Sequence, residues 1–197
     1  MTERLAIVTT LHLAGDTEAD QLLARDPFAL LVGMLLDQQV PMEKAFAGPA
    51  VIASRLGTDG LDPELVARYD ADEFAALVSR TPAVHRFPAS MAARIQKLAA
   101  FVLEEYDSDA SAIWTGAHNG TELLRRLKAL PGFGAQKAAI MVALLGKQFG
   151  VRPDGWREAA GAYGEPDATR SVADVVDAES LARVRATKRE AKRAAKA

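Results

Sequence analysis

The chain has 197 residues, of which 49% are hydrophobic and none is cysteine. This length supports one sizeable core or two small lobes. The absence of cysteine excludes disulfides, a thiol nucleophile and a cysteine-ligated zinc ion or iron–sulfur cluster. No apolar run reaches the roughly 18 residues that a membrane span needs, and the first residues lack the basic region and cleavage site of a secretion signal. We therefore expect a monomeric, cytoplasmic protein with no membrane partner.

The net charge of −2 hides an uneven distribution. Residues 183–197 contain seven lysines and arginines against one glutamate, a net charge of +6, so the remaining 182 residues carry −8. A basic tail of this kind fits a polyanion, because contacts with phosphates release counterions. It fits equally well a solvated helix end without a partner. The acidic body argues against DNA binding unless positive charge gathers on one face.

Alanine and leucine dominate and β-branched runs are few, which predicts an all-α protein. Residues 5–13 fit either a short strand or an extended segment, and a short helix is expected over 16–23. Asp26 followed by Pro27 is a strong helix start. The sequence from there to about Gln38 is apolar nearly all round, which predicts a central buried helix.

Further helices follow from the spacing of apolar residues and from capping side chains. A helical pattern resumes over 42–56, with an expected interruption at Gly48-Pro49. The later predicted helices cover 63–69, 71–79, 89–106, 120–129, 135–149, 156–162 and 178–194, and 163–170 is expected to be irregular. These elements predict one compact helical domain over 1–182 and a basic helical tail over 183–197. A division of the domain into two lobes with a cleft between them stays open.

The segment Pro131-Gly132-Phe133-Gly134 lies between two amphipathic helical stretches. Glycines on either side of one apolar residue allow a tight turn, because glycine accepts backbone angles that strain other residues. The following helix begins with amides that lack partners within the helix. Such a helix start binds phosphate through these amides and through the helix dipole. The pattern therefore predicts a DNA-binding hairpin over 120–149.

Residues 130–139, LPGFGAQKAA, resemble the helix–hairpin–helix signature of the base-excision DNA glycosylase (HhH-GPD) superfamily, related to endonuclease III, adenine glycosylase and the alkylpurine glycosylases. Residues 27–39, PFALLVGMLLDQQ, resemble the buried helix of that superfamily whose end supplies a DNA-probing glutamine, and Gln39 takes that position. The segment 87–98 resembles the helix before the hairpin. The resemblance covers about residues 27–157.

In that superfamily a Gly/Pro-rich loop after the hairpin holds a catalytic aspartate, at a fixed spacing from a position that is lysine in bifunctional members. That position is Gln136 here, and Asp154 lies at the matching spacing, eighteen residues further on. The resemblance implies that Asp154 stabilises positive charge on the sugar and orients a water. It also implies that no Schiff base forms at position 136. Turn chemistry alone would also place an aspartate between Pro153 and Gly155.

A base inside a duplex cannot be attacked, so its nucleotide must leave the stack. Gln39 is long, polar and flat, which suits the gap left behind, although it could equally end its helix. The residues expected to contact DNA are Gln39, Gly132, Phe133, Gly134, Gln136 and Lys137. Phe133 is also expected to plug the space between the hairpin helices. Lys137 is turned by about 100° from Gln136, and we expect it to point to phosphate or solvent.

Phe87, Trp114, Trp156 and Tyr163 are candidates for stacking on the extruded base, with a place in the core as the alternative for Phe87 and Trp156. The three histidines are scattered, so no metal site is expected. The resemblance implies that carbonyls of the hairpin hold a monovalent cation, and the missing cysteines exclude the iron–sulfur cluster of some members.

These features together predict a monofunctional DNA glycosylase that acts on a damaged or mispaired base in double-stranded DNA. One alternative is a non-catalytic protein of the same fold that binds abasic or distorted DNA. The other is a helical interaction module with no nucleic-acid role.

Overall fold

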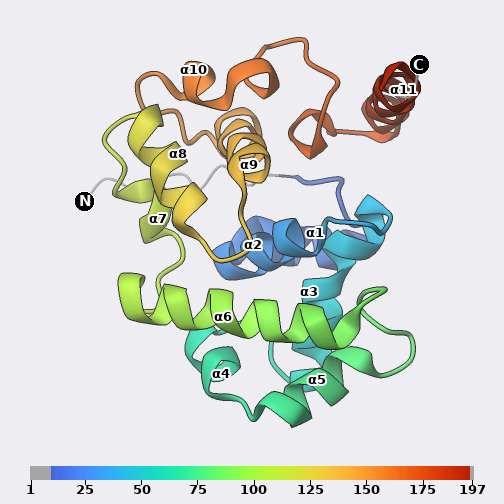
Figure 1. The fold of residues 1–197 in the computed structure, drawn as a ribbon, viewed down its shortest axis with the longest axis vertical. Coiled ribbons are helices and arrows are strands. Elements are labelled where there is room, and N and C mark those ends of the chain that lie inside the picture. The colour runs from blue at the N-terminus through green and yellow to red at the C-terminus, as the bar shows by residue number, and fades with distance from the viewer. Residues whose placement is uncertain (1–9, 196–197) are drawn as a thin grey trace.

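The computed structural model describes residues 10–195. Most of the segment 5–13 lies outside the described residues, and 10–13 are irregular. The described chain forms eleven α-helices and two short 3-10 helices without a β-strand, which confirms the all-α prediction (Figure 1). Within residues 10–195, no helix is both long enough and apolar enough to cross a membrane.

Capping side chains mark the starts of the helices, as the sequence predicts. The side chains of Asp16, Asp26, Asp62, Asp70, Asn119 and Asp177 each accept a hydrogen bond from a backbone amide in the first turn of the helix that follows. The helices are α1 (Thr17–Arg25), α2 (Pro27–Leu36), α3 (Met42–Leu56), α4 (Pro63–Arg68), α5 (Ala71–Ser79), α6 (Pro88–Tyr106), α7 (Ala112–Thr115), α8 (Gly120–Ala129), α9 (Ala135–Gln148), α10 (Trp156–Ala160) and α11 (Ala178–Ala194). The 3-10 helices are η1 (Gly161–Tyr163) and η2 (Val172–Asp174).

Two elements differ from expectation. The predicted interruption at Gly48-Pro49 is wrong, because α3 continues through both residues. Both are buried, and packing of α3 against α2 outweighs the backbone hydrogen bond that proline removes. The other difference is α7, which is only four residues long and carries no periodic pattern that would predict it.

Helix α2 lies at the centre of the molecule. All residues from Phe28 to Leu36 are buried, as predicted, and α2 contacts α1, α3 and α6. In Figure 1, α4, α5 and α6 lie below α2, α8, α9 and α10 lie above it, and α7 lies to its left. One apolar cluster runs through both parts of the described chain. The end of α2 is therefore held rigidly where the two parts meet.

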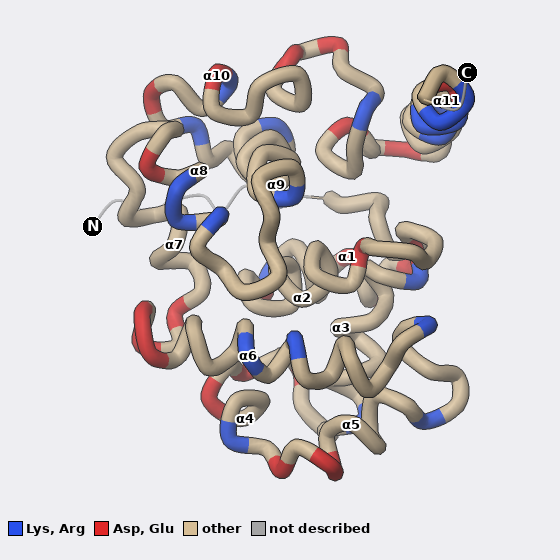
Figure 2. Tube along the Cα trace, in the orientation of Figure 1, with Lys and Arg blue, Asp and Glu red and all other residues tan. Residues whose placement is uncertain are grey.

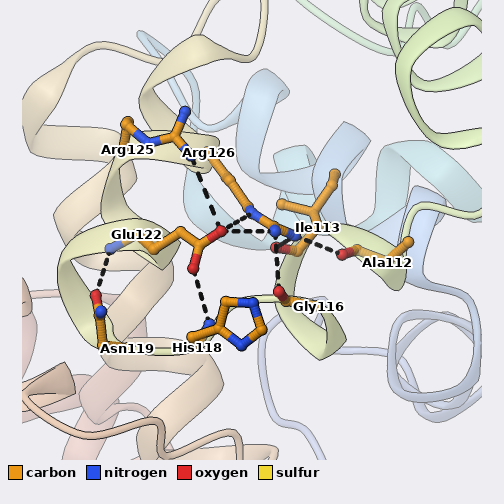
Figure 3. Close-up of polar contacts among 8 residues, drawn as sticks. All are labelled: Ala112, Ile113, Gly116, His118, Asn119, Glu122, Arg125 and Arg126. Atoms are coloured by element: carbon orange, nitrogen blue, oxygen red, sulfur yellow. Dashed lines mark hydrogen bonds and ion pairs between the residues drawn. The ribbon is translucent and has the colours of Figure 1, made fainter.

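The start of α8 is anchored by Arg126 (Figure 3). Its guanidinium donates to the carbonyl oxygens of Ala112 and Gly116, at 3.1 and 2.9 Å, and so closes the end of α7. It also bonds the Glu122 carboxylate at 2.7 Å. The amide of Glu122 in turn donates to the side chain of Asn119 at 2.9 Å. This network fixes the point at which the loop after α9 meets α8.

Gly120 allows that loop to approach. A Cβ atom at Gly120 would lie 2.4 Å from the carbonyl oxygen of Gly155 and 2.6 Å from the Cα of Trp156.

Because both neighbours are backbone atoms, the replacement Gly120→Ala is expected to lower the free energy of unfolding by about 2–3 kcal/mol. Urea denaturation measures this value. Gly134→Ala is the control, since a Cβ at Gly134 meets no atom within 4 Å, and it should change stability by less than about 1 kcal/mol. Equal losses in the two variants would contradict the packing described.

Candidate nucleic-acid interface

The hairpin between α8 and α9 forms the tight turn that the sequence predicts. Gly132 has a φ of +84°, a conformation that favours glycine, and the amide of Phe133 donates to the carbonyl oxygen of Leu130 at 3.0 Å. The Phe133 ring is buried, so this residue offers DNA only its backbone. Gly134 caps α9 without any side-chain hydrogen bond. The amides of the first turn of α9 thus remain available to an anion.

The turn packs directly on the end of α2. A Cβ atom at Gly132 would lie 2.5 Å from a methyl carbon of Leu35, and Leu35 is fully buried. No side chain fits between the hairpin and α2 at this point. The close approach places the hairpin next to the residues that follow α2, which include Gln39.

Lys137 makes a second connection between the hairpin and α2. Its ammonium group donates to the carbonyl oxygens of Met34 and Leu35, the latter at 3.2 Å. These carbonyls belong to the last turn of α2, where helix geometry leaves them without partners. The expectation that Lys137 points to phosphate or solvent is therefore corrected: its side chain caps a helix that is distant in the sequence.

Burial lowers the pKa of Lys137 to about 8, although the nearby carboxylate of Asp37 acts in the opposite direction. An unfolded lysine titrates near 10.4, so between about pH 8 and pH 10.5 the unfolded chain binds more protons than the folded one. The stability contributed by this site must therefore rise with pH across that window. Relative to Lys137→Met, the wild-type protein should gain up to about 3 kcal/mol between pH 7.5 and 10.5. Urea denaturation of both proteins at each pH measures the gain, and a constant difference would contradict it.

The chain after α2 is held in one conformation. The Gln38 side chain donates to the carbonyl oxygen of Leu35 at 2.8 Å and accepts from Arg94 at 3.3 Å. Its backbone oxygen lies 2.8 Å from Nε2 of His85. Gln39 follows with a φ of +57°, which is unusual for a residue with a side chain, and it is exposed. We call residues 38–39, 132–136 and Arg94 the hairpin–glutamine surface.

Of the four aromatic candidates, Phe87 is the most exposed, with 44% of its surface accessible, so the alternative of a place in the core is wrong for Phe87. Tyr163 is half-buried. Its amide donates to Nδ1 of His85 at 3.0 Å, and His85 in turn contacts Gln38, so Phe87 lies at the edge of the hairpin–glutamine surface. Trp114 and Trp156 are each only 8% exposed and belong to the core. The alternative of a place in the core therefore describes Trp156, and Trp114 lies in the core as well.

Asp154 lies at the other end of the hairpin helices. It is exposed, and its carbonyl oxygen accepts from the amide of Gly120 at 2.7 Å. Gly120 begins α8, whereas the hairpin turn follows the end of α8 at Ala129. Ten helical residues span about 15 Å. The structure therefore brings Gln39 to the hairpin but leaves Asp154 about one helix length away.

A different carboxylate lies beside the hairpin–glutamine surface. Asp37 ends α2 and directly precedes Gln38 and Gln39. Burial raises the pKa of its carboxyl group, an effect that Lys188 and Lys137 oppose. Desolvation together with a nearby charge is typical of functional carboxylates. The one sequence signal for Asp37 is its place two residues before Gln39, and the sequence analysis did not single it out.

Other features lie apart from this surface. A pocket of ≈840 Å³ opens between α1 and the start of α11, and its lining includes Asp16, Asp20 and Asp177 but no predicted site residue. Among residues 10–195, no three His, Asp or Glu side chains gather as metal ligands do. A monovalent cation at the hairpin carbonyls stays a prediction.

Comparison with known protein families gives a match over most of the chain. The model of the HhH-GPD superfamily base excision DNA repair protein matches residues 32–197, a span that contains the hairpin, Gln39 and α11. No curated protein matches the chain. The matched span is most of the sequence, and the chain therefore belongs to the HhH-GPD superfamily of base excision DNA repair proteins.

Proposed function

We propose that this protein is a monofunctional DNA glycosylase that binds duplex DNA, extrudes a damaged or mispaired nucleotide and hydrolyses its N-glycosidic bond. One observation carries the proposal: the hairpin turn contacts α2 at Leu35, four residues before the exposed Gln39. A phosphate-binding turn and a gap-filling side chain thus belong to one rigid surface, which is what nucleotide extrusion needs.

The roles divide between the backbone and the side chain. Phosphates bind at the amides of Gly134 and of the first turn of α9, where the helix dipole adds to the hydrogen bonds. The Gln39 side chain occupies the space that the extruded nucleotide vacates. The exposed ring of Phe87 is linked to this surface through His85, which bonds both the Phe87 amide and the Gln38 carbonyl oxygen. It offers a face on which the extruded base stacks.

The chemistry proposed is hydrolysis. A water oxygen forms a bond to the anomeric carbon while the bond from that carbon to the base nitrogen breaks. The base leaves with the bonding electrons and receives a proton, and the water gives up a proton to a carboxylate. That carboxylate also stabilises the positive charge that develops on the sugar. The products are a free base and an abasic site.

The lysine chemistry of bifunctional glycosylases has no support here. Gln136 has no amine, and its side chain donates to the Tyr163 hydroxyl at 2.9 Å. The amine of Lys137 is bonded to carbonyl oxygens of α2. Neither residue offers a free amine for attack on the sugar. Cleavage of the strand should therefore require alkali after the base has been released.

Two carboxylates are candidates for the hydrolytic role. Asp154 has the chain spacing that the resemblance implies, whereas Asp37 lies two residues before Gln39 and burial raises the pKa of its carboxyl group. An extruded nucleotide remains attached to phosphates that the hairpin binds, so the acid nearer to the hairpin is favoured. We propose that Asp37 is the carboxylate that acts on the sugar.

A second candidate function is DNA binding without catalysis. It is favoured by the position of Asp154, about one helix length (~15 Å) from the hairpin turn. In this case the protein recognises abasic or distorted DNA and leaves the glycosidic bond intact.

A panel of duplexes, each with one modified or mispaired base, separates the two functions. The wild-type protein is incubated with each duplex, and half of every sample is treated with alkali. The glycosylase proposal predicts strand cleavage of at least one duplex only after alkali. Salt-sensitive binding without cleavage of any duplex would support the non-catalytic function instead.

A further inference from the structure

Helix α11 carries positive charge that the hairpin–glutamine surface does not use. Lysines and arginines cover α11 in Figure 2, whereas acidic residues are frequent elsewhere on the described chain. The last fifteen residues, 183–197, carry +6 and the rest of the protein −8. Net positive charge is thus concentrated in one segment, and such a segment lets an otherwise acidic protein bind a polyanion.

The first half of α11 holds the helix on the body of the protein. Asp177 caps it with a hydrogen bond from the amide of Ser180 at 2.7 Å. Val184 is buried, and the hydroxyl of Thr187 lies 2.9 Å from that of Thr169. The second half extends beyond these contacts, and its residues from Lys188 onward are exposed.

The middle of α11 lies beside the loop that carries Gln39. Arg185 forms an ion pair with Glu43 at the start of α3. Lys188, one turn further on, is close enough to Asp37 to act on its pKa. Asp37 and Glu43 stand on either side of Gln39 in the chain, so α11 passes this loop.

Beyond Lys188 the positive charge continues along the same side of the helix. Arg185, Lys188 and Lys192 recur at helical spacing and lie on one face, with Arg189 next to them. Within residues 10–195, Arg189 and Lys192 form no ion pair with an acidic side chain. Their charge is therefore available to an external partner.

From this placement we propose that α11 is a second DNA-contacting element, in which Arg189 and Lys192 bind backbone phosphates of the duplex that the hairpin–glutamine surface engages. The inference rests on the proposed function only in taking duplex DNA as the partner. Phosphate contacts of this kind carry no sequence information. Helix α11 therefore adds affinity and orients the duplex, while Gln39 on the hairpin–glutamine surface probes the base pair.

The double variant Arg189→Gln/Lys192→Gln tests this, because glutamine keeps helix propensity and removes two charges. Binding to one duplex is measured by fluorescence anisotropy between about 50 and 300 mM salt. The binding constant falls as salt rises, and each lost phosphate contact makes this slope of log K against log salt shallower by about 0.9. We expect the magnitude of the slope to decrease by about 1.8 and the affinity near 100 mM salt to fall at least about 10-fold. The matched control is Arg68→Gln/Arg80→Gln on α4 and at the end of α5, which should leave the slope unchanged.

Equal slopes for the wild-type protein and the Arg189→Gln/Lys192→Gln variant, with circular dichroism showing that its helix content is intact, would overturn the inference. A tail that serves an acidic protein partner or solubility alone gives this result. Base release is measured at saturating protein on the same duplex panel, so that the glycosylase activity and the role of α11 in binding are tested separately. If no duplex in the panel is cleaved but the slope falls as expected, the glycosylase proposal fails and the role of α11 in DNA binding stands.

Discussion

Replacing Asp37 with asparagine is expected to slow base release by about 100- to 1000-fold, a loss of about 3–4 kcal/mol in transition-state stabilisation. Asparagine keeps the shape of the side chain and removes the negative charge that faces the developing positive charge on the sugar. The rate is measured under single-turnover conditions with protein in excess, on a duplex that the wild-type protein cleaves. Asp154→Asn is the matched variant and should change the rate by less than about 3-fold.

The pH dependence of the same rate gives an independent check. Burial raises the pKa of the Asp37 carboxyl, and the reaction needs its ionised form. The rate should therefore fall as the pH is lowered through this raised pKa, at a pH above the usual 3.9 of an aspartate.

A large loss in Asp154→Asn with little change in Asp37→Asn would contradict the assignment and place the chemistry at the other end of α8.

The substitution Gly132→Ala is expected to lower affinity for duplex DNA by about 100-fold and stability by about 2–4 kcal/mol. Two effects add: alanine is strained at a φ of +84°, and its Cβ would overlap Leu35, 2.5 Å away. Relief of this overlap moves the hairpin away from α2 and from Gln39. Affinity is measured by anisotropy at fixed salt, and stability by urea denaturation.

A double-mutant cycle isolates the contact between the hairpin and α2. Leu35→Ala removes the atom that a Cβ at position 132 would meet. In the Gly132→Ala/Leu35→Ala background the two losses should be less than additive, by about 1 kcal/mol or more, because the overlap no longer exists. Strict additivity would show that only backbone strain acts at Gly132.

Features set by neighbouring residues could be predicted from the sequence. The capping aspartates, the apolar α2 and the turn around Gly132 depend on a few consecutive side chains, and all three occur in the structure. The continuation of α3 through Pro49 could not be predicted in this way. It depends on tertiary packing, which overrides local propensity.

The candidate site was harder to predict because it depends on how distant elements meet. Asp154 keeps the spacing from Gln136 that the resemblance implies, and α9 and the following loop carry it to the start of α8. The direction of Lys137 depends on where the end of α2 lies, more than one hundred residues earlier. The raised pKa of the Asp37 carboxyl depends on its burial by neighbouring elements, which the sequence does not show. No local sequence pattern indicates where Asp154 and the Lys137 side chain lie, because both placements depend on residues that are distant in the sequence.

Chemical cross-linking tests most directly whether the hairpin and Gln39 meet one duplex. The chain has no cysteine, so Gln39→Cys and Gln136→Cys each introduce a single thiol on the hairpin–glutamine surface. The exposed position Ala76 on α5 supplies the control, Ala76→Cys. Each variant is incubated with duplexes that carry one disulfide-activated tether at successive positions around an abasic site. We predict that both surface variants cross-link to the same duplex within a few nucleotides of that site and that the control does not. Cross-linking by only one of the two, or yields no higher than those of the control, would contradict a joint interface.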